Sequence, residues 1–224
     1  MKITRFSFMA ALLALSFSLT SGAHAFGLKL PGGAGGGGGN WSAIANDFNT
    51  GLVTIAEQSA ETSRIIATLL EALDLKQQAA ELRGKADNIS KKGDSLGADD
   101  LDAATKLSDN AVGEIKAKLA SAGTLSGEQK TKMAEAGARY IPALIKAVEG
   151  AKRLKDAADK ASSAGTPGLG DGAAVIKVAK NIPTLAPKAL SFVGNSVKTG
   201  STLISILREN EIAIPKAEMP SIAF

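Results

Sequence analysis

The strongest structural signal in the chain lies in residues 173–208, which read AAVIKVAKNIPTLAPKALSFVGNSVKTGSTLISILR. At about 100° per residue, the spacing of an α-helix, aliphatic side chains recur on one side and lysines on the other. The pattern predicts an amphipathic helix with a bend or break at Pro183 and Pro187, because proline lacks the N–H that a helix interior needs. The apolar positions are Val175, Ala179, Ile182, Ala186, Leu190, Val193, Val197, Ile204 and Leu207, and the lysines are Lys177, Lys180, Lys188 and Lys198.

Three segments upstream carry the same periodicity. Residues 42–92 predict one long helix, or two that meet near Gly84, with one apolar face. Another helix is expected from Asp99 or Asp100 to Gly123, and a further one from after Ser126 to Gly165, with Pro142 inside it. Together the four segments predict an all-α fold: an antiparallel bundle of about four amphipathic helices over residues 42–209, one or two of them kinked by proline. The apolar positions of the first segment are Ile44, Phe48, Leu52, Ile55, Ile66, Leu69 and Leu73.

The beginning of the chain has the three parts of a secretory signal. Lys2 and Arg5 precede an apolar run from Phe6 to Leu19, and the small-x-small site Ala23-His24-Ala25 follows. We therefore expect residues 1–25 to be cleaved and the protein to lie in the periplasm or to be secreted. Residues 26–41 include five consecutive glycines and predict a flexible tether. Residues 210–224 contain two prolines and predict an extended C-terminal tail.

The composition narrows the chemistry that this protein can perform. The chain has no cysteine, and its single histidine, His24, lies in the predicted signal. Most nucleophilic and metal-site chemistry depends on these two residue types, so we expect no cofactor, no metal and no catalysis. The formal net charge is +4, which becomes +2 when Lys2 and Arg5 are removed. Such a mild charge argues against nucleic acid as the partner.

Charge is distributed unevenly along the chain. Residues 94–114 hold six acids and one lysine, a net charge of −5, whereas residues 172–208 hold four lysines and one arginine without an acid, a net charge of +5. One interpretation is that these two helices lie near each other and help to choose the helix pairing. The alternative is that helix 173–208 inserts its apolar side at a membrane surface, with Lys177, Lys180, Lys188 and Lys198 facing anionic lipid heads or a partner.

Trp41, the only tryptophan, lies where the predicted tether meets the first helix. It can pack ahead of Ser42, an expected helix cap, and so fix the start of the helix. Alternatively, Trp41 anchors a binding partner, since exposed tryptophans are frequent hot spots of interfaces. The packing interpretation is the favoured one.

Three carboxylates, Asp99, Asp100 and Asp102, fall within four residues. Paired carboxylates can perform acid–base work or bind a hard cation, but the ligand ladder of a calcium loop is missing here. Acids at a helix start interact favourably with the helix dipole, which is the simpler interpretation.

These observations predict an exported, non-catalytic helical-bundle protein that acts as a binding or structural component of the cell envelope. Its partner is an unknown protein or a second copy of the chain. The runner-up is a protein in peripheral membrane contact through helix 173–208, at anionic lipid surfaces. An enzyme with a lysine or carboxylate centre comes third.

Overall fold

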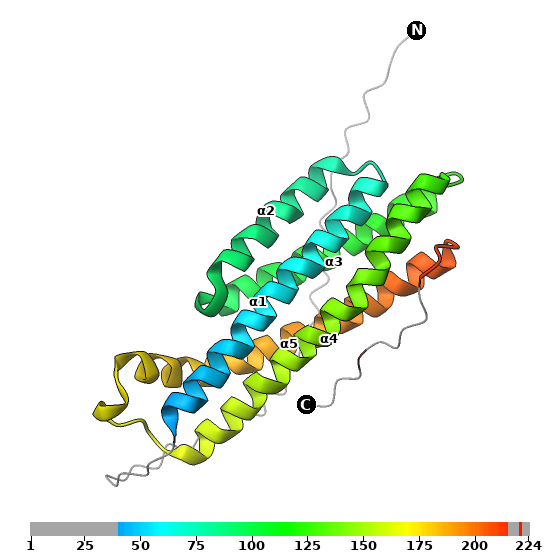
Figure 1. Cartoon of the computed structure of the whole chain (residues 1–224). Coiled ribbons are helices and arrows are strands. Elements are labelled where there is room, and N and C mark those ends of the chain that lie inside the picture. The colour runs from blue at the N-terminus through cyan, green and yellow to red at the C-terminus, as the bar shows by residue number, and fades with distance from the viewer. Residues whose placement is uncertain (1–39, 215–219, 221–224) are drawn as a thin grey trace, which may run out of the picture.

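The computed structural model describes residues 40–214 and Pro220, and all regular structure in this part of the chain is helical (Figure 1). The all-α prediction is therefore confirmed, and the predicted helix 173–208 agrees with α5 to within one residue. Five α-helices and two short 3₁₀ helices occur among the described residues: α1 (Trp41–Ala72), α2 (Lys76–Lys92), η1 (Gly93–Ser95), α3 (Ala98–Ser121), α4 (Gly127–Ala164), η2 (Leu169–Asp171) and α5 (Ala173–Glu209).

Several predictions concern residues outside the described part. The signal peptide (1–25), residues 26–39 of the tether, and residues 215–219 and 221–224 of the tail all lie there. The boundary of the tether is corrected by one residue, because α1 begins at Trp41 and not at residue 42. Its cap is Asn40 in place of Ser42: the Asn40 carboxamide oxygen accepts a hydrogen bond of 3.1 Å from the backbone N–H of Ala43.

The predicted stretch 42–92 is two helices, and they separate at Leu73–Leu75 instead of near Gly84, which lies inside α2. Asp74 adopts a left-handed φ of 62°. The N–H of Leu75 donates to the carbonyl of Leu70 at 2.9 Å, and the N–H of Asp74 donates to Glu71 at 3.0 Å. This pair of bonds is a Schellman motif, which closes the end of a helix. Glycine usually occupies the left-handed position, so the aspartate gave no recognisable stop signal.

The prolines do not interrupt their helices. Pro142 lies inside α4, and Pro183 and Pro187 lie inside α5. All three are exposed, so the backbone irregularity that each introduces faces away from the core.

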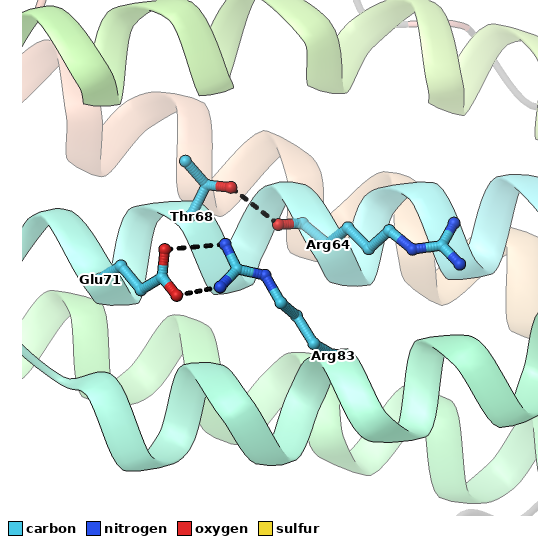
Figure 2. A network of polar contacts seen from close by, with 4 residues as sticks. All are labelled: Arg64, Thr68, Glu71 and Arg83. Carbon is cyan, nitrogen blue, oxygen red and sulfur yellow. Dashed lines mark hydrogen bonds and ion pairs between the residues drawn. The ribbon is translucent and has the colours of Figure 1, made fainter.

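Polar contacts define the directions of the helices. The hairpin of α1 and α2 is antiparallel: Arg64 binds Asp87 at 2.8 Å, and Glu71 accepts two hydrogen bonds from the guanidinium of Arg83 (Figure 2). The hydrogen bond from Arg64 is the main reason why the pKa of Asp87 lies below its ordinary value.

The helices α1 and α4 are also antiparallel, whereas α3 and α5 run in the same direction. Arg139 of α4 pairs with Glu61 of α1, and Lys160 pairs with the earlier Asp47. Between α3 and α5, Asp102 pairs with Lys188 and Asp109 with the later Thr199. The prediction of an antiparallel bundle is therefore wrong for α3 and α5, which are parallel neighbours. Successive helices alternate in direction, so the third and the fifth run the same way.

The helix α1 lies at the centre of the bundle and contacts each of the other four α-helices (Figure 1). All seven apolar positions that the sequence predicted for the first segment, six in α1 and Leu73 just after it, are at most 4% exposed. At the crossing of α1 and α4, Gly51 and Gly150 bring the two backbones into direct proximity. Along its length α1 contributes to two core clusters, one that includes Ile55 and a second that includes Leu70.

Candidate functional site

A groove of about 530 Å³ opens between the first half of α1, the η1–α3 junction and the start of α5. Its floor is apolar, because Phe48, Leu52, Leu96 and Leu185 are each at most 8% exposed. Its rim is polar and mostly exposed to solvent. The rim side chains are Asn49 from α1, Asp94 and Ser95 from η1, and Lys177, Asn181 and Thr184 from α5.

Hydrogen bonds hold the wall of the groove at the start of α3. The Asp100 carboxylate accepts from the backbone N–H of Gly97 at 2.9 Å and from the Lys92 ammonium at 2.5 Å. Partial burial by itself raises the pKa of Asp100, but the bonds from Lys92 and Gly97 outweigh it and leave the pKa below its ordinary value. Asp100 is thus a charged cap, which agrees with the capping interpretation of this acidic stretch.

The opposite wall is the beginning of α5. Ala174, Lys177, Val178 and Asn181 face the groove from this helix. Val178 is only partly buried, in contrast to the Phe48 and Leu52 side chains across from it. The two walls therefore differ, since hydrogen bonds hold the wall at the start of α3, whereas the α5 wall is exposed along most of its length.

The four candidate lysines lie in different surroundings along α5. Lys177 lines the groove, and Lys180 is exposed on the same part of α5. Lys188 pairs with Asp102 of α3 at 2.9 Å, which brings the basic helix against the acidic one. Lys198 lies 21 residues beyond Lys177, about 30 Å along a helix at 1.5 Å per residue. The four lysines do not form one site.

Lys198 borders a second recess, between α3 and α5. Asp109, Lys116, Asn195 and Thr199 also line it. The Thr199 hydroxyl donates a hydrogen bond of 2.5 Å to Asp109. This hydrogen bond joins the two parallel helices at the recess.

Trp41 is buried, with 4% of its surface exposed, and belongs to the core cluster around Phe48 and Leu52. This placement fits the packing role. Its indole N–H is buried and has no hydrogen-bond acceptor among the described residues. The side chain does not line the groove.

Two lysines, Lys132 and Lys155, have a pKa above the ordinary value for lysine. Hydrogen bonds from Lys132 to Glu128 and from Lys155 to Asp159 raise the pKa of each lysine, which keeps both protonated. Within the described residues, no group of three or more histidine, cysteine or acidic side chains could hold a metal ion. In the same part of the chain, no helix has both the length and the apolar content that a membrane crossing requires.

Comparison of the chain with protein-family models, curated proteins and solved structures finds no match. The sequence indicated only Lys177 among the polar rim residues of the groove. Asn49, Ser95, Asn181 and Thr184 carry no motif and come from three elements, so their proximity had no signal in the sequence. The one local hint was the pair of glycines at Gly93 and Gly97, which marks an irregular connection.

Proposed function

We propose that this is an exported, non-catalytic bundle protein that acts as a binding component of the cell envelope, and that the groove between α1, α3 and α5 is its binding surface. The observation that carries the proposal is the contrast between an apolar floor and a polar rim within one recess. Sites that recognise ligands combine these two features, because apolar burial supplies affinity while a few polar groups set orientation.

The rim favours an uncharged apolar segment of a protein partner. Asn49 and Asn181 each carry a donor and an acceptor, which is what the N–H and C=O groups of a peptide need. Lys177 and Asp94 contribute one charge of each sign from opposite walls. A net charge on the ligand would therefore add little to the binding free energy, and we expect binding to depend only weakly on salt concentration.

Site-specific photo-cross-linking tests this proposal. With p-benzoylphenylalanine in place of Asn181, at the rim, the protein is expected to give one dominant adduct in the envelope fraction of its native cells. The matched control carries the same group in place of Ser201, which is exposed on the same helix but does not line the groove. The readout is adduct mass on a denaturing gel, followed by mass spectrometry.

Equal adducts from both positions, or none from position 181, would contradict binding in the groove. An adduct of twice the mass of the protein would identify the partner as a second copy of the chain. The unmodified protein from the same fraction gives its intact mass, which is expected to lack residues 1–25. A full-length product in the cytosol would contradict export.

The second candidate is peripheral contact with anionic lipid. The observation in its favour is that Val175, Ile176 and Val178 are only partly buried at the start of α5, beside exposed Lys177 and Lys180. The later part of α5 contributes core residues such as Val193 and Leu207, so insertion of the whole helix 173–208 would break the bundle. The narrower form of this candidate uses residues 173–181 alone.

Vesicle co-sedimentation separates the two candidates. If lipid contact is the function, vesicles with anionic lipid bring down the protein, and replacing Lys177 and Lys180 by glutamate abolishes the effect, because each lysine contributes about 1 kcal/mol near such a surface. Under the groove proposal, co-sedimentation stays at the level of vesicles made of zwitterionic lipid. Added salt provides the control, because it weakens the lipid contact and leaves the groove unaffected.

A further inference from the structure

Burial changes abruptly within α5. From Ala173 to Asn181 every side chain is exposed or only partly buried. From Ile182 onward the helix contributes fully packed residues, with Ile182 at 2% exposure and Ala189 and Val193 at 0%. Residues 173–181 are therefore attached to the bundle much more loosely than the rest of α5.

The backbone is weakest at the same place. Pro183 and Pro187 have no N–H, so the carbonyls of Ala179 and Pro183 lack the helical hydrogen bond from four residues ahead. At the other end of the segment, Gly172 has a φ of 86° and gives α5 no side-chain cap. Residues 173–181 thus lie between a proline pair and a glycine, both of which favour a change of direction.

Within residues 40–214, the start of α5 lacks the polar contacts to other helices that the rest of the bundle has. The other contacts between helices include ion pairs, such as Glu61 with Arg139 and Asp102 with Lys188. Among the described residues, no side-chain hydrogen bond or ion pair joins residues 173–181 to another element. Movement of the segment would break only partial apolar contacts, which is typical of regions that open locally.

The segment also forms one wall of the groove. Ala174, Lys177, Val178 and Asn181 line it from α5, while the floor includes core residues of α1 and the facing wall is the hydrogen-bonded start of α3. We propose that residues 173–181 are a hinged lid, which bends where Pro183 leaves the carbonyl of Ala179 without its helical hydrogen bond and controls access to the apolar floor. The lid regulates the binding surface proposed above and rests on that proposal for its biological role.

Limited trypsin digestion of the free protein tests the hinge. Four lysines of α5 serve as internal markers: Lys177 and Lys180 on the lid, and Lys188 and Lys198 on the packed part. Cleavage after the lid lysines is expected to be at least tenfold faster, because cleavage of the packed part requires the core to unfold. Mass spectrometry of the fragments gives each rate. Equal rates at all four sites would overturn the proposal.

Removal of the prolines provides the decisive variant. The double substitution Pro183→Ala, Pro187→Ala restores two backbone donors, and both side chains are exposed, so the change leaves no cavity. We expect cleavage at Lys177 and Lys180 to slow about tenfold. The matched control Pro142→Ala makes the same change in α4 and is expected to leave these two rates unaltered. An unchanged rate in the double variant would contradict a proline hinge.

Thiol labelling measures access to the floor itself. Because the chain has no cysteine, Leu52→Cys introduces a single thiol on the groove floor, where the side chain is 1% exposed. Leu70→Cys places the same thiol at 0% exposure on α1, away from the groove. A maleimide is expected to react at least tenfold faster at position 52, and the alanine double variant is expected to abolish the difference. Equal reaction rates at the two positions would overturn the lid.

These measurements use the protein without a partner. Fast cleavage and labelling combined with no cross-link from position 181 would leave the hinge standing and refute the binding function. A clear cross-link combined with slow, uniform cleavage would support the binding function and refute the hinge. The two proposals therefore fail separately.

Discussion

Replacing Ile55 by alanine is expected to lower the free energy of unfolding by about 2–5 kcal/mol, the range for removing a large aliphatic side chain from a packed core. Ile55 is fully buried near the middle of α1, the helix that contacts all the others. The loss combines the transfer free energy of the deleted carbons with the cost of the cavity that remains. Equilibrium urea unfolding followed by circular dichroism gives the value.

The same substitution at Ile145 is the control. Its side chain is 42% exposed on α4, so Ile145→Ala is expected to change the free energy of unfolding by less than about 0.5 kcal/mol. Both changes replace isoleucine by alanine in a helix, and helix propensity therefore cancels between them. Similar losses at the two positions would mean that α1 is not the centre of the core.

Adding one methyl group at Gly51 is expected to destabilise the protein by about 1–3 kcal/mol, although alanine is the better helix former. A Cβ atom at this position would lie 2.9 Å from the carbonyl oxygen of Gly150 and 2.9 Å from Cγ of Leu154. Because one neighbour is backbone, α1 and α4 would have to move apart to accept it. The shift would loosen the packing of the whole crossing.

Gly84→Ala is the matched change and is expected to have the opposite sign. Gly84 lies inside α2, and apart from the adjoining backbone of the same helix no atom of the described residues lies within 4 Å of the Cβ that alanine would add. The substitution should therefore stabilise the protein by roughly 0.5–1 kcal/mol, through helix propensity and the reduced entropy of the unfolded chain. A stabilising Gly51→Ala, measured by thermal or urea unfolding, would show that the helices do not cross as closely as described.

The helices and much of the core could be predicted because helical periodicity is a local property of the chain. Ile44, Phe48 and Leu73 of the first segment lie on one face and are all buried. In α5 the prediction was less accurate: Ile182 and Val193 are buried, whereas Val175 and Ala179 are only partly so. Periodicity reports which residues share a face, but it cannot report how far along that face a neighbouring helix extends.

The break at Asp74 could not be read from the chain, because only the packing of Leu73 and the two bonds of the Schellman motif hold an aspartate at positive φ. The candidate site was predicted still less well. Lys177 was selected for its charge, but its neighbours Asn49 and Ser95 are more than 80 residues away in sequence. Single polar residues on separate elements acquire a shared role only when the elements meet.

Local order thus followed from residue spacing alone: the helices of the described residues, the buried face of α1, and a basic helix with two prolines inside it. Tertiary packing decided the rest, including five helices in place of about four, the parallel pair α3 and α5, and a groove beside the loosely held start of α5. The physical reason is the sequence distance over which each kind of interaction acts. A hydrophobic stripe repeats every few residues within one helix, whereas the choice of neighbour depends on close backbone approaches and ion pairs between residues far apart in the chain.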